Sequence, residues 1–229
     1  NFNNEIHHPF IIKSKFVGNE LPHKMIFVNN CEQLKAVLES DFQYICINPF
    51  QREKINNLES LKFKKIYVRV PNIIRGEFSY IENFINKNLN KIEGIVTANL
   101  GIMSKFKDKI RILGDYKLNI TNSSALDFYG KITSGDCLSV ELNRNEIEDI
   151  IGKSDVKAQV LVYGKIELMV SEYCVVGSTI GNKGRFKNCS EPCRREGFLL
   201  LDRKKKKFVL KTDKFCRSYI YNSVPINLI

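Results

Sequence analysis

Short apolar segments rich in β-branched residues alternate with amphipathic helical patterns from residue 25 onward. The alternation occurs seven times, which is typical of parallel strands joined by crossover helices. Seven βα units approach the eight of a closed barrel, so the sequence predicts an α/β fold with a TIM-barrel-like, incomplete β/α repeat. An open doubly wound sheet is the alternative. The predicted strands are residues 25–28, 44–47, 65–70, 94–97, 111–113, 137–140 and 159–162.

Helical patterns occupy the connections between these strands. Residues 31–40 and 78–88 place apolar side chains on one helical face. Asn30 and Asn143 are predicted N-caps, because a Gln or Glu stands three residues after each of them, as in a capping box.

The two ends of the chain depart from the repeat. Residues 1–24 predict a strand and a linker that continue from an upstream domain of a longer parent chain. Residues 25–170 are expected to form the barrel-like domain, and residues 171–229 a C-terminal cysteine-rich metal-binding module. Within the module, two apolar runs flank a charged run at residues 202–207, which predicts a β-hairpin with a charged tip.

Polar residues follow several predicted strands, at the carboxyl edge where β/α folds place functional groups. Asp115, Asn119 and Glu141 are the candidate catalytic residues, and Asn99 and Asn122 are candidate substrate ligands. Asn and Asp also form turns and caps, so a single one of these residues indicates little, and it is the group that suggests a functional site. We expect these residues to converge on one rim, close to the cysteine module.

Four of the seven cysteines lie in the last quarter of the chain, separated by 14, 3 and 22 residues: Cys174, Cys189, Cys193 and Cys216. Four thiolates suit tetrahedral zinc or an iron–sulfur cluster. Zinc ribbons favour Cys-x2-Cys pairs, which are absent here, so the spacing favours iron–sulfur over zinc. Cysteines without a metal are the remaining interpretation. The other three lie singly in predicted strands and helices, where a small buried side chain is expected: Cys31, Cys46 and Cys137.

Positive charge is concentrated around these cysteines. The chain carries a net charge of +11, and residues 183–217 contain thirteen Lys or Arg against four Asp or Glu, a local excess of 13 − 4 = +9. Such a field attracts a polyanion such as RNA, although a solvated basic face is the alternative. Arg194, Arg195 and Arg217 lie next to cysteines and are candidate substrate-binding residues for a phosphate or a carboxylate.

Several classes of protein are disfavoured by residues that the sequence lacks. Its three histidines, His7, His8 and His23, all precede the β/α repeat, so a Ser-His-Asp or Cys-His hydrolase would have no imidazole there. No apolar stretch approaches the roughly 20 residues of a membrane span, and the first residues lack a signal-peptide layout. We therefore expect a cytoplasmic protein that does not enter a membrane.

Several motifs resemble the signature region of the collagenase-like peptidases, peptidase family U32. They are MVSEYC at 169–174, NCSEPCR at 188–194, FVLKTD at 208–213 and CRSYIYNS at 216–223. The resemblance extends backward through GDYKLN at 114–119 and covers nearly everything from residue 25. One departure is Glu167, which stands where several relatives carry an additional cysteine, so Cys216 is the expected fourth ligand.

The resemblance implies a barrel-like domain and a 4Fe-4S cluster held by the four cysteines. Family members with assigned chemistry hydroxylate RNA bases or a ubiquinone precursor without molecular oxygen, and prephenate is implicated in the RNA cases. The resemblance therefore predicts an iron–sulfur-dependent hydroxylase of an rRNA or tRNA base. RNA would be its partner, and prephenate or a similar carboxylate its co-substrate. A collagenase-like peptidase and a non-catalytic, metal-stabilised RNA-binding domain are the alternatives.

Overall fold

The computed structural model describes residues 16, 21–52, 61, 63–184, 188–195 and 197–228. Within this part of the chain two compact units form. Unit 1 consists of Asn1–Met25 and Lys65–Val160, and unit 2 of Ile26–Lys64 and Leu161–Ile229. Most of the predicted N-terminal strand and linker, residues 1–24, lies outside the described residues. The predicted domain boundaries after residues 24 and 170 stay predictions.

Unit 1 is built on a parallel sheet whose strands are paired in chain order. These strands are β3 (Lys65–Arg69), β4 (Gly94–Thr97), β5 (Arg111–Gly114), β6 (Gly135–Cys137) and β7 (Ala158–Gln159). Chain-order parallel pairing is the topology of a β/α barrel, whereas the strand order of a doubly wound sheet reverses at a switch point. The α/β class and an incomplete barrel-like sheet are thus confirmed.

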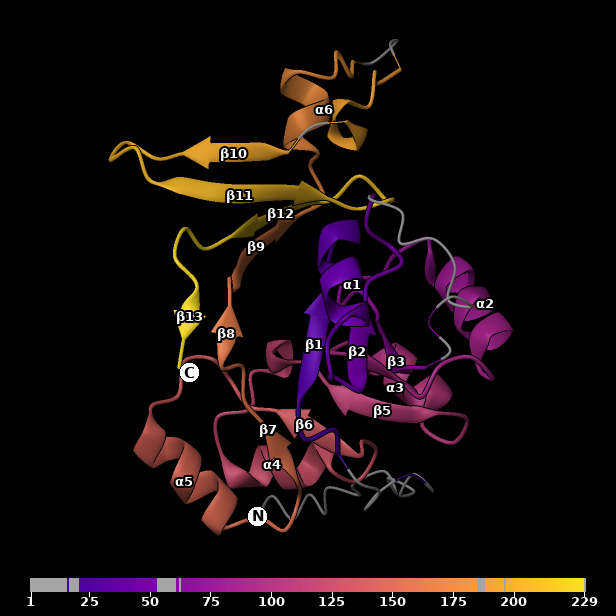
Figure 1. Ribbon diagram of the computed structural model, residues 1–229, viewed down its shortest axis with the longest axis vertical. Coiled ribbons are helices and arrows are strands. Elements are labelled where there is room, and N and C mark those ends of the chain that lie inside the picture. The colour runs from indigo at the N-terminus through magenta and orange to yellow at the C-terminus, as the bar shows by residue number, and fades with distance from the viewer. Residues whose placement is uncertain are drawn as a thin grey trace, which may run out of the picture. The chain divides into compact units, whose positions relative to one another are not determined.

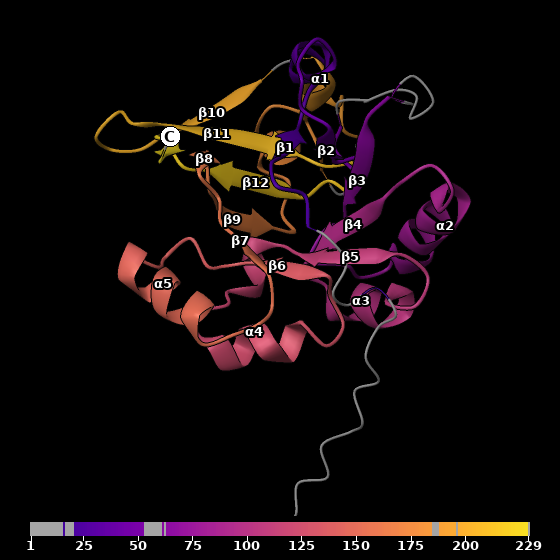
Figure 2. The same ribbon diagram turned by 60° about the horizontal axis from the view of Figure 1, so that its bottom comes forward.

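Helices connect the strands of unit 1. They are α2 (Phe78–Asn88), α3 (Leu100–Phe106), the 3-10 turn η2 (Tyr116–Leu118), α4 (Ser123–Tyr129) and α5 (Arg144–Gly152). Figure 2 shows α3 and α4 covering one face of β5 and β6. Apolar side chains between these layers are fully buried, among them Ile102, Ile112 and Leu126. Burial of this kind is the main favourable contribution to folding.

Unit 2 begins with β1 (Met25–Val28), α1 (Cys31–Leu38) and β2 (Tyr44–Ile47) and resumes after Val160. Its C-terminal part contains a four-stranded antiparallel sheet in the order β10-β11-β12-β9 and a two-stranded pair of β13 and β8 (Figure 1). The bounds are β8 (Tyr163–Gly164), β9 (Glu167–Ser171), α6 (Val175–Thr179), η3 (Pro192–Arg194), β10 (Phe198–Leu201), β11 (Lys207–Thr212), β12 (Ser218–Tyr221) and β13 (Ile226–Asn227).

All seven strands predicted from the apolar runs are present, and the predicted hairpin is β10 and β11. The strands β6 and β7 begin one or two residues earlier than predicted and are shorter. Beyond β7, Val160 and Val162 are 40% and 42% exposed, so their side chains gain nothing from continuing a buried strand. Asn30 and Asn143 cap α1 and α5 as predicted.

The isolated cysteines agree with the prediction only in part. Cys46 is buried in β2, and Cys137 at the end of β6 is partly buried. The prediction was wrong for Cys31, which is exposed because the first turn of α1 turns this position toward solvent. None of the described helices has both the length and the apolar character needed to span a bilayer.

Candidate functional site

The four C-terminal cysteines lie on different segments of unit 2. Cys174 is the N-cap of α6, and its Sγ accepts a hydrogen bond from the backbone N–H of Gly177 at 3.3 Å. Cys189 precedes η3, and its Sγ accepts from the N–H of Glu191 at 3.3 Å. Cys193 lies within η3, and Cys216 lies in the turn between β11 and β12.

These segments bring the cysteine side chains into one region. Cys174 is buried in an apolar cluster with Val176 and Leu210, and both Cys193 and Cys216 pack against that cluster. Cys189 reaches the same helix. A Cβ built on Gly177 would lie 3.2 Å from Sγ of Cys174 and 3.5 Å from Sγ of Cys189. Both sulfurs therefore face the same point on α6.

A second glycine, directly after the C-cap of α6, leaves room for Cys189. A Cβ on Gly181 would lie only 2.6 Å from Sγ of Cys189, which is closer than real Cβ atoms approach any heavy atom. Only glycine leaves the sulfur in its present position.

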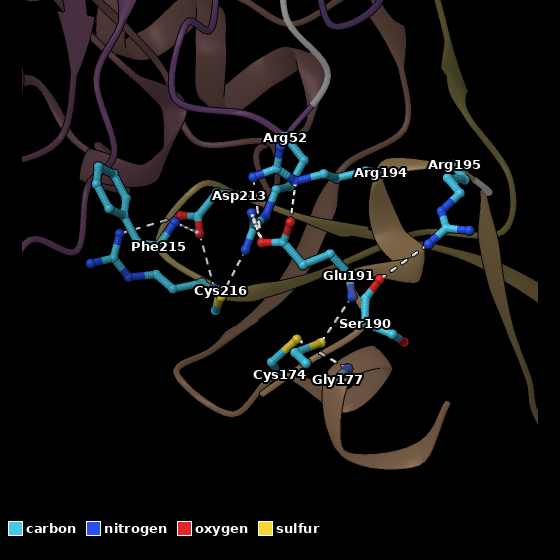
Figure 3. A network of polar contacts seen from close by, with 12 residues as sticks. Arg52, Cys174, Gly177, Ser190, Glu191, Arg194, Arg195, Asp213, Phe215 and Cys216 are labelled. Atoms are coloured by element: carbon cyan, nitrogen blue, oxygen red, sulfur yellow. Dashed lines mark hydrogen bonds and ion pairs between the residues drawn. The ribbon is translucent and has the colours of Figure 1, made fainter. Parts of the chain in front are cut away.

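A guanidinium group lies against the sulfur of Cys216. Nη2 of Arg52 is 2.9 Å from that Sγ, and Nη1 of the same side chain is 3.0 Å from Oε1 of Glu191 (Figure 3). Burial disfavours the charged guanidinium, yet the neighbouring side chains of Cys216 and Cys193 raise the pKa of Arg52 above its usual value. Arg52 thus joins the turn that carries Cys216 to the loop that carries Cys189 and Cys193.

The two residues that Arg52 contacts both have left-handed backbones. Glu191 has φ 51° and Cys216 has φ 64°. Residues other than glycine and asparagine rarely adopt the left-handed backbone region, and surrounding contacts must hold them there. The contacts of Arg52 supply part of that restraint, which makes the arginine a structural member of the site.

A buried carboxylate fixes the turn of Cys216. Asp213 is 2% exposed and accepts hydrogen bonds from the backbone N–H groups of Phe215 and Arg217, each at 2.9 Å. It also accepts one from the hydroxyl of Tyr219 at 2.8 Å. Burial raises the pKa of Asp213, and these hydrogen bonds oppose the rise.

The three candidate substrate-binding arginines occupy different environments. Arg217 is 2% exposed and forms ion pairs with Glu172 at 2.8 Å and with Asp213 at 3.3 Å, which favours a positioning role for its side chain. Arg194 is half exposed and pairs with Glu191 at 2.6 Å. Arg195 is exposed and donates to the carbonyl oxygen of Ser190 (Figure 3). Arg194 and Arg195 therefore remain accessible beside Cys193.

Unit 1 holds the candidate catalytic residue Asp115, which is 4% exposed. Its Oδ2 lies 2.7 Å from Nε of Arg69, at the end of β3. Burial would raise the pKa of Asp115, but the guanidinium of Arg69 holds that pKa below its ordinary value. The backbone N–H of Asp115 donates to the carbonyl of Thr97, and the N–H of Asn99 donates to Oγ1 of the same threonine.

The other candidates of unit 1 form local contacts at the same carboxyl edge of the sheet. Asn119, with φ 53°, accepts a hydrogen bond from Oγ of Ser139 at 2.6 Å, and the N–H of the exposed Glu141 donates to that Oγ. Asn99 and Asn122 are the N-caps of α3 and α4. Their roles in catalysis or binding, and the expected approach of this edge to the cysteines, stay predictions.

Sequence reasoning missed Arg52 entirely. It stands 164 positions before Cys216, between two predicted strands, and no local motif marks it. Within the residues described, no three His, Cys, Asp or Glu side chains are already arranged around a single point as ligands of one metal ion.

Comparison with known proteins gives consistent results. The model of a family described as peptidase family U32 matches residues 48–229. A curated relative, the "Uncharacterized protease MJ0090" of Methanocaldococcus jannaschii, is 26% identical over 165 residues, which cover 66% of this chain and 40% of that protein. The chain thus spans less than half the length of this relative. "The Structure of the U32 Peptidase Mk0906" matches with a TM-score of 0.53 at 8% identity, over 64% of this chain and 71% of that one, which supports a common fold.

Proposed function

Because the chain belongs to peptidase family U32, we propose that it uses an iron–sulfur cluster on Cys174, Cys189, Cys193 and Cys216 to hydroxylate an RNA base without molecular oxygen. The contact of 2.9 Å between Arg52 and Sγ of Cys216 is the observation that carries this proposal. A cation at that distance complements the negative charge that a metal-bound cysteine carries.

The residues present fit a four-iron cluster. The sulfurs of Cys174 and Cys189 each accept a backbone N–H group, and Cys174 is also buried. The sulfur of Cys216 faces the guanidinium of Arg52, which would offset the net negative charge of a cluster with four thiolates. Gly177 and Gly181 leave space beside two of the sulfurs. When bound, such a cluster supplies redox chemistry or an iron that polarises an oxygen atom.

Zinc on the same four thiolates is the alternative metal. Four sulfurs at about 2.3 Å from one zinc ion would have to lie within roughly 4 Å of each other. In a four-iron cluster each sulfur binds a different iron, so the sulfurs stand farther apart. The cysteine spacing, which lacks the Cys-x2-Cys pairs of zinc ribbons, favours the larger group.

The charge of this region supports an anionic substrate. Arg194 and Arg195 are accessible beside Cys193 and suit a phosphate or the carboxylate of a co-substrate such as prephenate. The excess of nine positive charges in residues 183–217 suits RNA, which is a polyanion, more than a peptide of unspecified charge.

A peptidase is the second candidate, because the matched relatives carry that name. The contact between Cys216 and Arg52 is the observation that favours it, since a cysteine beside a cation can serve as a nucleophile. The sequence contains no histidine after His23, so no imidazole of the C-terminal part can protonate the leaving amine. For this reason we rank the peptidase below the hydroxylase.

Anaerobic purification with iron and sulfide analysis tests the proposal. We expect a broad absorption band in the violet, about four irons and four sulfides per chain, and loss of both in Cys189→Ser and Cys193→Ser. Cys46→Ser is the matched control and should keep the cluster, because Cys46 is buried in β2. Stoichiometric zinc without iron would overturn the proposal. Mass spectrometry of RNA incubated with the loaded protein, prephenate and a two-electron acceptor should then show one added oxygen atom, and a non-catalytic RNA-binding domain would add none.

A further inference from the structure

The turn between β10 and β11 (Figure 1) consists of charged residues and is held by hydrogen bonds of its own. The carboxylate of Asp202 accepts hydrogen bonds from the N–H groups of Lys204 and Lys206, each at 2.8 Å. The N–H of Asp202 donates to the carbonyl of Lys206 at 3.1 Å, and that of Lys205 donates to the carbonyl of Asp202 at 3.0 Å. The only acidic side chain of the tip is therefore bound to the backbone, and the tip has a defined shape.

One lysine of the tip has a backbone that a glycine or an asparagine would adopt more easily. Lys205 has φ 62°, in the left-handed region. Hairpin turns usually place Gly or Asn at such a position, because a Cβ is strained there. The chain has a cation at this position instead, which keeps the run of positive charge unbroken through the turn.

The positive charges of the tip have no acidic partners among the residues that the structure describes. Residues 203–207 are Arg-Lys-Lys-Lys-Lys, all five are exposed, and none forms an ion pair there. Five like charges in succession repel one another unless an anion lies among them. The tip is thus built to receive a ligand with several negative charges.

The strands behind the tip carry an apolar and aromatic row that is exposed on β10 and half-buried at Val209 and Tyr221. In β10, Leu199 is 53% and Leu201 is 65% exposed. Leu199 pairs with Val209, which pairs in turn with Tyr221, and Leu201 pairs with Lys207. Directly paired residues of antiparallel strands lie on the same face of a sheet. One face therefore carries an apolar and aromatic row beside the cationic tip.

The opposite face of the same strands covers the cysteines. Phe198 and Leu200 of β10 and Leu210 of β11 belong to the apolar cluster that contains Cys174. In addition, β11 runs directly from the tip to the turn of Cys216, a length of about 20 Å for its six residues. A short oligonucleotide bound to the exposed face of the hairpin could therefore extend as far as the candidate metal centre.

We propose that the β10–β11 hairpin is the docking surface for single-stranded RNA, with phosphates at the residues 203–207 and bases against the row of Leu199, Val209 and Tyr221. The choice of RNA rests on the proposed function. Single-stranded nucleic acids are bound in this way, by cations along the backbone and by base faces on aromatic and apolar side chains of a sheet. A loop that enters a membrane would carry its large apolar side chains at the tip, whereas residues 202–206 are all charged.

The test uses a fluorescein-labelled single-stranded RNA of mixed sequence and measures its affinity over a range of salt concentrations. The hairpin variant combines Lys204→Gln, Lys206→Gln and Lys207→Gln. A control variant removes the same charge from exposed lysines of unit 1, with Lys87→Gln, Lys131→Gln and Lys157→Gln. We expect the hairpin variant to bind about tenfold more weakly at low salt and to lower the log–log salt slope by about 2, because each lost phosphate contact removes about 0.7. The control variant should match the parent protein.

Tyr221→Ala tests the row on the strands. Loss of stacking should weaken binding by about tenfold without changing the salt slope, because stacking releases no counterions. Equal losses in the hairpin and control variants would overturn the proposal in favour of diffuse charge. Binding of phosphatidylserine vesicles or polyglutamate in place of RNA would overturn it as well. The iron content separates the two proposals. If the parent protein contains the cluster and the hairpin variant binds RNA with the same affinity as the parent, the docking surface alone is refuted. If the parent protein contains no iron, the proposed function is refuted.

Discussion

Nη2 of Arg52 lies 2.9 Å from Sγ of Cys216, although the two residues are 164 positions apart in the chain. The same guanidinium holds Glu191, which stands between Cys189 and Cys193. One side chain therefore joins the segments that carry three of the four candidate ligands. Groups of this kind, which touch the ligands rather than the metal, commonly decide how tightly a metal site holds its ion.

In a protein loaded with the proposed cluster, replacement of Arg52 should weaken the hold on iron. Arg52→Met removes the charge beside Cys216, and we expect iron to be released at about 10- to 100-fold lower chelator concentrations than from the parent protein. Arg52→Lys keeps the charge but loses the two-pronged guanidinium that contacts both Glu191 and Cys216. It should therefore release iron at a chelator concentration between those of the parent protein and Arg52→Met. Chelator titration followed by absorption measures the difference. Equal retention by all three proteins would show that Arg52 has no part in the site.

The glycine beside Cys189 gives an independent test. A methyl group at residue 181 would collide with Sγ of Cys189, so Gly181→Ala should move that sulfur and reduce the iron and sulfide bound per chain. Gly184→Ala is the matched control, because a Cβ there meets nothing within 4 Å. Full iron content in Gly181→Ala would mean that Cys189 is not a ligand.

Asp136 predicts a pH dependence of stability. It is fully buried in β6, accepts a hydrogen bond from Oγ1 of Thr133, and burial raises its pKa to about 7. A raised pKa means that the stabilisation is complete below the pKa of the unfolded chain and is lost as the pH rises through about 7. The free energy of unfolding should fall by roughly 4 kcal/mol from about pH 4 to pH 8 through this group. Urea denaturation of Asp136→Asn should lack this fall, and an identical pH profile in both proteins would contradict the assignment.

The ion pair of Asp115 and Arg69 contributes with the opposite sign. The guanidinium of Arg69 lowers the pKa of Asp115 in the folded protein. The resulting stabilisation is therefore present above the pKa that an aspartate has in the unfolded chain, and it is lost as the pH falls through the lower pKa of the folded protein. Arg69→Met leaves a buried carboxylate without its ion-pair partner and should cost about 3 to 5 kcal/mol at pH 7. Asp115→Asn combined with Arg69→Met should cost clearly less. Denaturation in urea measures both, and equal costs would mean that the charge of Asp115 is not the cause.

Local patterns of the sequence predicted most of the fold. The strands β1 to β5 follow from apolar runs, and the caps Asn30 and Asn143 follow from side chains that bond the backbone three residues away. Both kinds of signal depend on neighbours in the chain. The division into two units depends on contacts between distant segments, and no local pattern carries that information.

The site shows the same limit. The motifs identified the cysteines, and the structure brings their segments together in unit 2. Adjacency in sequence was a poor guide for Arg217, whose side chain is buried with Asp213 and Glu172 although it directly follows Cys216. It gave no indication of Arg52, since the contact with Cys216 forms only after folding.

The order in which unit 2 is assembled follows from its two separate segments. During synthesis, residues 26–64 emerge first and must wait until the whole of residues 65–160 has been made before their partners at 161–229 appear. Unit 1 is complete by then and can fold on its own schedule, because domains generally fold as units. The sulfur of Cys216 meets Arg52 only at the end of this sequence of events. Until that moment the four thiols are open to oxidants, so the nascent chain needs a reducing environment until unit 2 has folded.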